Sequence, residues 1–254
     1  MTRRVRLDAL VVERGLAATR ARARALALAG QVRVDGTVVS KAGAAVPADA
    51  DVTLAAPDHP YAGRGGIKLA HALDAFGVAV GGRTALDIGA STGGFTDVLV
   101  QRGAARVAAV DVGHGQLAWK LRRDPRVAVL EGLNARGLER ALLPPAFRHV
   151  DLVTVDVSFI SAKLMLPPIP PLLRPDADVI VLVKPQFEAG RAEVGKRGLV
   201  TDGAVHRRVV DEVAAAADRI GLGRVAATPS PITGAEGNRE FFLHLRARAA
   251  AANA

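Results

Sequence analysis

Four charged residues lie at the ends of four short apolar segments of the chain. The segments are 84–88, 107–110, 150–155 and 179–183, and the charged residues at their ends are Asp87, Asp111, Asp156 and Lys184. Apolar runs of this length, separated by helical patterns, are typical of strands in a parallel sheet that is covered on both faces. Ligands of such sheets bind at the carboxyl ends of the strands. The spacing therefore predicts one site built from three carboxylates and one amine.

Lys184 is the member of this set that is most suited to proton transfer. It ends the most hydrophobic of the predicted strands, in the sequence Leu-Val-Lys-Pro-Gln-Phe at 182–187. Burial disfavours the ammonium form of a lysine, and a neutral amine is a candidate general base. The alternative is a lysine whose head group reaches the solvent and takes no part in chemistry.

A glycine-rich segment, 87–97, follows the first of these strands with the sequence Asp-Ile-Gly-Ala-Ser-Thr-Gly-Gly-Phe-Thr-Asp. It does not match a dinucleotide fingerprint, because Ser91 stands where the second glycine is needed, and it lacks the lysine of a phosphate loop. Its glycines allow close approach of an uncharged group, and the segment resembles the S-adenosylmethionine site of Rossmann-like methyltransferases. Asp111, about twenty residues further on, suits the two hydroxyls of a ribose. A tight strand-to-helix turn without a ligand is the alternative.

Strands and helices alternate from residue 64 onward. Helices are predicted at 67–76, 94–102 and 204–220, and strands at 84–88, 107–110, 127–130, 150–155, 179–183 and 241–245. The alternation predicts an α/β fold, with one doubly wound domain at 65–247 around a mostly parallel sheet. The alanine-rich residues 248–254 are expected to form a flexible tail.

Positive charge is concentrated at the start of the chain. The net charge is +9, and residues 1–41 hold nine basic against three acidic residues, which is two-thirds of the excess. Residues 42–60 then contain three aspartates and no lysine or arginine. This distribution predicts a surface for a polyanion. The alternative for the arginines at 20, 22 and 24 is a solvated helix face.

The basic head has the pattern of a small α+β domain at 1–58, joined to the second domain by a linker at 59–64. Helical patterns at 7–13 and 19–30 precede strands at 32–34, 38–39 and 52–54, with a hairpin turn at Asp35-Gly36. Residues 5–57 resemble the small RNA-binding domain named after a ribosomal small-subunit protein. The resemblance implies contacts with the backbone and shape of RNA. They would involve Arg4, Arg6, Arg14, Arg20, Arg22, Arg24, Arg33 and Lys41.

Composition excludes several classes of protein. The chain has no cysteine, which excludes a disulfide scaffold and a cysteine nucleophile, and its six histidines form no His-x-x-x-His pair, so no metal is expected. No run reaches the roughly 18 apolar residues that span a bilayer. The N-terminus lacks the pattern of a signal peptide. We therefore expect a cytoplasmic protein without stable membrane association.

Seven segments, in order along the chain, resemble the TlyA family of rRNA 2′-O-methyltransferases, which are also labelled haemolysin A. They are 64–69, 87–96, 115–119, 134–136, 156–161, 183–188 and 237–243. The catalytic part is similar to the FtsJ type of ribose methyltransferase, which uses a Lys-Asp-Lys-Glu tetrad. Carried over by motif, the tetrad here is Lys68, Asp156, Lys184 and Glu240.

The family resemblance implies a Rossmann-like domain with a seven-stranded sheet and S-adenosyl-L-methionine as cofactor. In the implied reaction Lys184 takes or shares the proton of a ribose 2′-hydroxyl and Lys68 keeps Lys184 from being charged, while the two acids orient the lysines. The residues implied for cofactor binding are Asp87, Gly89, Ala90, Ser91, Thr92, Gly93, Gly94, Phe95, Asp111, Asn134 and Asp156.

The implied substrate is a cytidine of ribosomal RNA, in 23S rRNA of the 50S subunit, with 16S rRNA of the 30S subunit left open as a second target. The family also implies a link to susceptibility to capreomycin. Three alternatives are a membrane-active haemolysin-type protein, an RNA-binding ribosome-assembly factor with an inactive methyltransferase fold, and a small-molecule methyltransferase. The lack of a spanning segment argues against the first, the complete tetrad against the second, and the basic head against the third.

Overall fold

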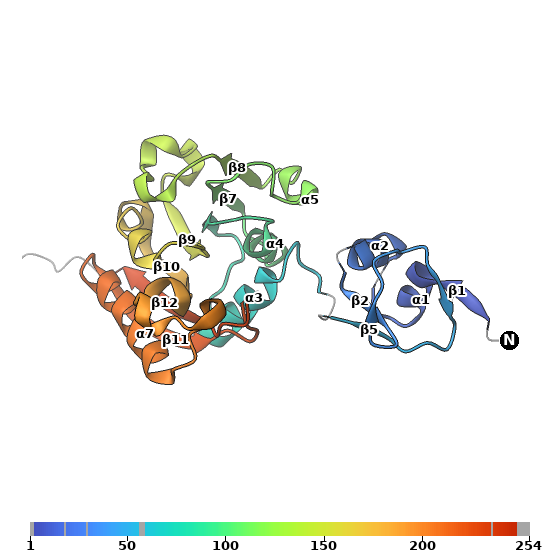
Figure 1. The fold of residues 1–254 in the computed structure, drawn as a ribbon. Helices are drawn as coiled ribbons and strands as arrows, with labels where there is room; N and C mark the ends of the chain where they lie inside the picture. The colour runs from blue at the N-terminus through green and yellow to red at the C-terminus, as the bar shows by residue number, and fades with distance from the viewer. Residues whose placement is uncertain (1–2, 18, 29, 56–58, 235, 248–254) are drawn as a thin grey trace, which may run out of the picture. The chain divides into compact units, whose positions relative to one another are not determined.

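The computed structural model describes residues 3–17, 19–28, 30–55, 59–234 and 236–247. The chain divides into two units, Met1–Pro60 and Tyr61–Ala254 (Figure 1). Residues 61–64, which the sequence analysis places in the linker, belong to the second unit. The reason is local packing, because the Ala62 N–H donates to Asp97 Oδ2 at 2.7 Å and a Cβ on Gly66 would lie 2.3 Å from the Tyr61 ring. The predicted tail at 248–254 lies outside the described residues.

The first unit is a small α+β domain around its own apolar core. Two helices pack on a three-stranded antiparallel sheet of order β3-β2-β5, and a separate two-stranded sheet pairs β1 with β4. Asp35 (φ 48°) and Gly36 (φ 77°) form the predicted turn between β2 and β3, because both positions of such a turn need positive φ. The elements are β1 (Arg4–Arg6), α1 (Leu7–Glu13), α2 (Arg20–Leu28), β2 (Val32–Val34), β3 (Thr37–Val38), β4 (Ala45–Pro47) and β5 (Val52–Leu54).

The second unit is built on a seven-stranded sheet of order β11-β12-β10-β9-β6-β7-β8. All neighbouring strands are parallel except where β12 pairs with β10 and β11. The strands are β6 (Thr84–Ile88), β7 (Arg106–Asp111), β8 (Val127–Glu131), β9 (Val150–Val155), β10 (Leu173–Val183), β11 (Leu222–Pro229) and β12 (Phe241–Ala247).

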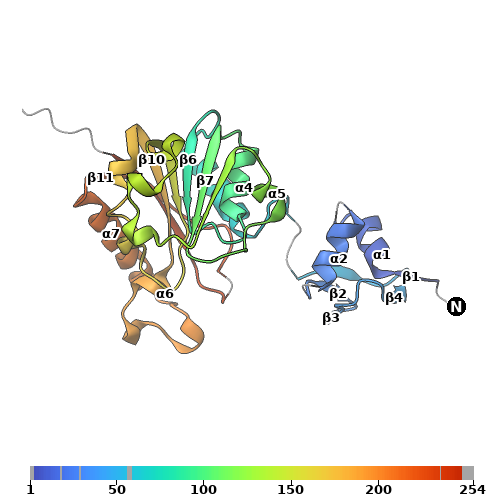
Figure 2. The ribbon, with the colours of Figure 1, turned by 90° about the horizontal axis from the view of Figure 1, so that it is seen from above.

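Helices cover both faces of this sheet (Figure 2). The α-helices are α3 (Gly65–Phe76), α4 (Gly94–Gln101), α5 (Trp119–Arg122), α6 (Pro185–Glu188) and α7 (Gly203–Asp218). Short 3₁₀ helices fill the connections: η1 (Ala135–Gly137), η2 (Arg140–Leu142), η3 (Pro145–Phe147), η4 (Ala162–Leu164), η5 (Pro170–Leu172), η6 (Arg191–Glu193) and η7 (Lys196–Gly198).

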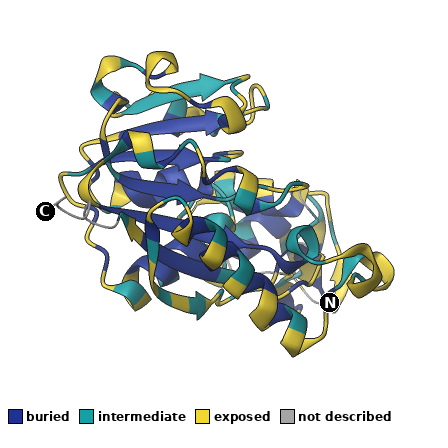
Figure 3. Cartoon of the chain, turned by 90° about the vertical axis from the view of Figure 1, so that its left-hand side faces the viewer, coloured by how far each residue is buried: buried dark blue, intermediate teal, exposed yellow. Residues whose placement is uncertain are grey.

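The apolar side chains of each strand alternate between two cores. In β10, Val179, Val181 and Val183 face the core that α7 covers, whereas Ile180 and Leu182 face the core under α3 and α4. This alternation is the period-two consequence of strand geometry, and it explains why the strand is a continuous apolar run. The sheet is accordingly buried in the middle of the unit, and exposed residues lie on the outer sides of the helices (Figure 3).

The centre of the sheet is the place where the chain changes direction. From β6 it moves outward through β7 to β8, and it then returns to β9 on the other side of β6. The loops that follow β6 and β9 therefore diverge, and this switch point is where ligands of such folds bind. The seventh strand, β11, is absent from the sequence prediction because its sequence, with one Gly, one Arg and one Pro, shows little apolar pattern at the sheet edge.

Candidate active site

Lys184 and Asp156 form an ion pair at the carboxyl ends of β10 and β9. These neighbouring parallel strands end at the same edge of the sheet, so the residues that follow them are brought side by side. The distance from Lys184 Nζ to Asp156 Oδ1 is 2.5 Å, and Lys184 Nζ donates to Ser158 Oγ at 2.9 Å. The lysine side chain is only 10% exposed. Its amine is therefore held in place by two partners rather than extended into solvent.

A second lysine–carboxylate pair lies at the same edge. Lys68 on α3 contacts Glu240, the residue before β12, with 2.5 Å between Nζ and Oε2. Phe241 of β12 pairs with Val183 of β10, so Glu240 and Lys184, which are next to them in the sequence, lie close together. A Cβ on Gly65, at the start of α3, would lie 3.8 Å from Asp156 Oδ2. The structure thus gathers the four predicted tetrad residues at one end of the sheet as two pairs, in which Lys68, Lys184 and Glu240 are buried and Asp156 is 20% exposed.

A cavity of about 550 Å³ lies at the switch point, and Asp156 is part of its lining, whereas Lys68, Lys184 and Glu240 are not. Apolar side chains at the end of β6, at and after the end of β7, and after β8 and β9 form much of its wall, while carboxylates, amides, hydroxyls and one guanidinium, that of Arg136, supply its polar groups. Of the residues predicted for cofactor binding, five line it: Gly89, Ser91, Asp111, Asn134 and Asp156. The other predicted residues, Asp87, Ala90, Thr92, Gly93, Gly94 and Phe95, lie outside its lining.

Glycine is required at two points of the turn after β6. Gly89 has φ 86°, and a Cβ there would lie 2.1 Å from the Asp156 carbonyl oxygen. Gly93 has φ 95°, and its Cβ would lie 2.3 Å from a methyl group of Leu121. Both the backbone conformation and the space exclude a side chain. The turn therefore brings bare backbone to the edge of the cavity.

Asp111 is fixed at the cavity by backbone hydrogen bonds. The Ser91 N–H donates to its Oδ2 and the Gly113 N–H donates to its Oδ1, each at 2.7 Å. A carboxylate oxygen has a second lone pair, so both oxygens retain acceptor capacity for a ligand. Asn134 is held in a similar way, because its Oδ1 accepts the Arg136 N–H at 3.0 Å.

Asp87 lies beneath the glycine turn and is fully buried. Its carboxylate accepts hydrogen bonds from Thr96 Oγ1 at 2.6 Å and from Thr154 Oγ1 at 2.8 Å. Burial raises the pKa of this carboxyl to about 6, although the two hydroxyls oppose the rise. Phe95 is also internal, and its ring stacks on Phe242 with 6.1 Å between centroids. These residues shape the turn from below.

Sequence reasoning gave no role to several residues of the site. Ser158, which contacts Lys184, and Phe159, whose side chain is exposed, both line the cavity. Gln116 also lines it and accepts a hydrogen bond from Ser91 Oγ at 3.3 Å. The signal that could have found the first two is a run of polar and aromatic residues directly after a buried strand.

In the first unit, the predicted RNA contacts come from several elements. Arg6 and Arg20 both bind Asp8, at 2.8 and 3.1 Å. The hydrogen bond from Arg6, together with that from Arg20, lowers the pKa of the Asp8 carboxyl to about 2 against the effect of burial. Arg4, Arg14 and Arg33 donate to backbone carbonyls. Arg24 on α2 and Lys41 after β3 are exposed, and Arg22 on α2 is half-buried.

Two further structural findings concern membranes and metals. Within the described part of the chain, no helix combines the length and apolar character needed to cross a membrane. The same residues contain no cluster of three or more histidines and acids that could hold a metal ion.

The strand order, the glycine turn after β6 and the acid after β7 define a Rossmann-like methyltransferase domain. The model of the FtsJ-like methyltransferase family matches residues 61–247, and the model of the S4 domain matches residues 5–52. The chain therefore belongs to the FtsJ-like methyltransferase family and carries an S4 domain before its methyltransferase domain.

Curated relatives extend over nearly the whole chain. The 16S/23S rRNA (cytidine-2′-O)-methyltransferase TlyA of Mycobacterium tuberculosis is 49% identical, over 97% of this chain and 91% of that protein. Hemolysin A of Brachyspira hyodysenteriae is 38% identical, over 94% of this chain and 99% of that protein. These matches confirm the resemblance to the TlyA family that the seven motifs indicated.

Solved structures confirm the fold. A hemolysin structure from Streptococcus thermophilus has a TM-score of 0.75 and 40% identity, and covers 97% of this chain and 90% of that one. An S-adenosylmethionine-dependent methyltransferase from Listeria monocytogenes has a TM-score of 0.54 at 15% identity, over 74% of this chain and 100% of that one, so its likeness is one of fold alone. The predicted arrangement of a small basic domain before a mostly parallel, seven-stranded α/β domain is confirmed.

Proposed function

We propose that this protein transfers a methyl group from S-adenosylmethionine to the ribose 2′-hydroxyl of a cytidine in ribosomal RNA, on assembled subunits. The observation that carries the proposal is the pairing of Lys184 with Asp156, which lines the cavity, and of Lys68 with Glu240 at the same end of the sheet. The relative named for the same reaction is 49% identical over nearly the full length. The 23S rRNA is the first expected target, and 16S rRNA is the second.

The residues of the cavity fit S-adenosylmethionine. Asp111 has acceptor capacity on both oxygens for the two ribose hydroxyls, and the bare backbone at Gly89 allows close approach of the amino acid part. Asn134 lies in the same lining and would border the adenine. When bound, the cofactor supplies an electrophilic methyl group, and the protein supplies geometry and electrostatics.

The lysines and acids have different parts in the proposed reaction. Lys184 takes or shares the proton of the 2′-hydroxyl, and Asp156 with Ser158 fixes its Nζ atom. Lys68 brings a second positive charge to the same edge, and Glu240 orients it. Most of the rate is expected from alignment of the hydroxyl oxygen with the methyl group, because well-oriented groups reach effective molarities of about 10⁵ M and above.

The S4 domain is proposed to bind the RNA around the target. Its exposed arginines suit phosphate groups, which carry most of the affinity between proteins and nucleic acids. Structured RNA is recognised largely by shape and by backbone contacts, so this role needs no aromatic platform. The two domains would thus divide docking from chemistry.

The proposal is tested with labelled S-adenosylmethionine and purified 30S and 50S subunits that lack the modification. We expect label in at least one subunit, and mass spectrometry of nuclease fragments should place it on the ribose of a single cytidine. Label on a base or on a ribosomal protein, or no label in either subunit, would contradict the proposal. Separate reactions with each subunit decide between one target and two.

A further inference from the structure

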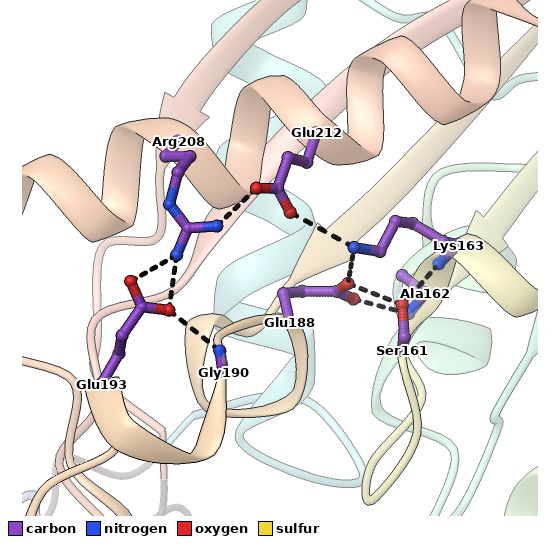
Figure 4. A network of polar contacts seen from close by, with 8 residues as sticks. All are labelled: Ser161, Ala162, Lys163, Glu188, Gly190, Glu193, Arg208 and Glu212. Atoms are coloured by element: carbon purple, nitrogen blue, oxygen red, sulfur yellow. Dashed lines mark hydrogen bonds and ion pairs between the residues drawn. The ribbon is translucent and has the colours of Figure 1, made fainter.

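Glu188 is a buried carboxylate that the proposed reaction does not use. It ends α6, four residues after Lys184, and its side chain is only 1% exposed. Its Oε2 accepts the hydroxyl of Ser161 and its Oε1 accepts the N–H of Ala162, each at 2.6 Å. The Lys163 ammonium lies 3.6 Å from Oε2 (Figure 4). These three partners, Ser161, Ala162 and Lys163, all belong to the segment that follows Asp156.

Glu188 therefore joins the two segments that carry the reacting pair. Residues 156–162 follow β9 and residues 184–188 follow β10, and these segments meet at three levels. At the cavity, Lys184 binds Asp156 and Ser158. In the middle, the rings of Phe159 and Phe187 lie 5.4 Å apart. At the far end, Glu188 holds Ser161 and Ala162.

The segment after β9 needs such a restraint. Residues 156–161 form no helix or strand, and although the Asp156 N–H donates to the Ile88 carbonyl at 2.9 Å, no strand ladder continues beyond it. Within them Phe159 has φ 65°, a conformation that is costly for a bulky residue and persists only where the surroundings enforce it. A buried carboxylate is itself unfavourable unless its oxygens are bonded. Packing alone would be served as well by an apolar side chain, so the charge points to a positional role.

A chain of ion pairs continues outward from Glu188 and provides a natural control. Lys163 also lies 3.4 Å from Glu212 on α7. Glu212 in turn accepts from Arg208, which binds Glu193 at the end of η6 (Figure 4). The side chains of these outer pairs are between 31% and 43% exposed. Surface pairs of this kind contribute little to stability.

We propose that Glu188 is a positioning residue of the transfer reaction. It holds the segment after β9 against the segment after β10, and so keeps Asp156 and Ser158 on the Lys184 amine. This inference rests on the proposed function and adds to it a residue that touches neither cofactor nor RNA. It acts through Ser161 and Ala162, at the end of the segment remote from the cavity.

The test compares four variants of the full-length protein: Glu188→Ala, Glu188→Gln, Ser161→Ala and Glu212→Gln. Methyl transfer to unmodified subunits gives kcat and the KM for S-adenosylmethionine. We expect Glu188→Ala to lower kcat about 10- to 100-fold, since a displacement of about 1 Å at a reacting group has effects of this size. Its KM should rise by a smaller factor than kcat falls, because the displaced segment supplies only part of the cavity lining, whereas Asp111 and the glycine turn are not altered.

Glu188→Gln keeps an acceptor for the Ala162 N–H and a partner for Ser161, so it should recover kcat to within about threefold of the wild type. Ser161→Ala removes one of the two bonds and should lower kcat a few-fold, and Glu212→Gln should leave kcat within about twofold. Rescue by glutamine, which keeps the shape of glutamate without its charge, separates a role of the hydrogen bonds from a role of the charge, and the loss in Ser161→Ala separates the hydrogen bonds from the packing of residue 188.

Three results would overturn the inference: an unchanged kcat in Glu188→Ala, no rescue by glutamine, or a raised KM with kcat intact. If Glu188→Ala does not fold, the same readouts on Ser161→Ala decide, and an unchanged kcat there overturns the inference. An inactive wild type overturns the proposed function and this role with it. An active wild type with an equally active Glu188→Ala protein overturns only the role of Glu188.

Discussion

The two units of this protein carry positive charge in opposite ways. In the S4 domain, the side chains of Arg6 and Arg20 are 56% and 59% exposed and share one acid. In the methyltransferase domain, Lys68 and Lys184 are each only 10% exposed, and each has a carboxylate of its own. Exposed cations attract a polyanion over distance and are screened by salt, whereas a buried pair has one defined geometry. Under the proposed function, exposure thus separates charge for docking from charge for chemistry.

The buried acids show the same contrast. Asp8 lies under the exposed arginines, which lower its pKa to about 2. Asp87 lies under the glycine turn, where burial raises its pKa to about 6. Both carboxylates are almost inaccessible to solvent. The difference lies in their partners, since Asp8 has two guanidinium groups and Asp87 has two threonine hydroxyls. Asp8 is therefore held as a carboxylate by neighbouring charges, whereas Asp87 is held by neutral donors and binds a proton at a higher pH.

The largest effect is expected from Lys184, the buried lysine that the proposed reaction uses as a base. Lys184→Ala should lower methyl transfer by about 10³-fold, within the range of general acid–base contributions. Lys184→Arg keeps a positive charge beside Asp156 but cannot act as a base, so it should be as inactive as Lys184→Ala. Transfer assays and calorimetric binding of S-adenosylhomocysteine check this, with binding expected within about threefold of the wild type. Normal transfer by either variant would refute the proton role.

The next effect concerns the pH dependence of the stability of the methyltransferase domain. The folded-state pKa of Asp87 is raised, so the folded state binds more protons than the unfolded state between about pH 4 and 6, and stability falls as pH rises through this window. The loss amounts to at most about 3 kcal/mol for this group. Asp87→Asn should remove it. Urea unfolding followed by the fluorescence of Trp119, the single tryptophan, reports on this domain. If the unfolding free energy depends equally on pH in Asp87→Asn and in the wild type, the raised pKa of Asp87 is contradicted.

The opposite sign is expected for Asp8. Its folded-state pKa is depressed, so its contribution is present above about pH 4 and is lost as pH falls toward 2. We expect about 1 kcal/mol after allowance for solvent screening of the exposed arginines. Pepsin is active in this range, and cleavage within residues 3–55 should be roughly fivefold faster in Asp8→Asn than in the wild type at pH 4. The cleavage rates of the two proteins should converge near pH 2. A constant ratio of these rates between pH 4 and 2 would contradict the lowered pKa of Asp8.

Strand pattern predicted most of the methyltransferase fold because its strands are continuous apolar runs. The pattern failed for β11, an edge strand, and for β1 and β4, whose three-residue strands show no alternation strong enough to detect. Of the four tetrad residues, only Asp156 and Lys184 follow apolar strands. Lys68 and Glu240 came from family resemblance, because a helix start and a loop give no such signal.

Apart from the nearness of Asp156 to Lys184, the contacts between the two loops could not be read from the sequence. Ser158 and Glu188 lie within recognised motifs, but their partners depend on how two loops pack against each other. Neither loop has a periodic pattern, and the loops are joined only once β9 and β10 are paired. Asp87 shows the reverse case, in which a residue at a strand end proved to lie beneath the cavity rather than in its lining.

The smallest effects are expected from single arginines of the S4 domain. Arg24 on α2 is exposed, and Arg24→Ala should weaken binding to ribosomal subunits about two- to fivefold and reduce the salt dependence of the affinity by about one charge. At saturating subunit concentration its kcat should equal that of the wild type, because the lysine pairs are in the other domain. Arg219→Ala, an exposed arginine at the end of α7, is the matched control and should change neither quantity. Filter binding between about 50 and 200 mM salt measures the slope. A reduced kcat with unchanged affinity in Arg24→Ala would break the division between docking and chemistry, since an exposed cation would then act in the chemical step.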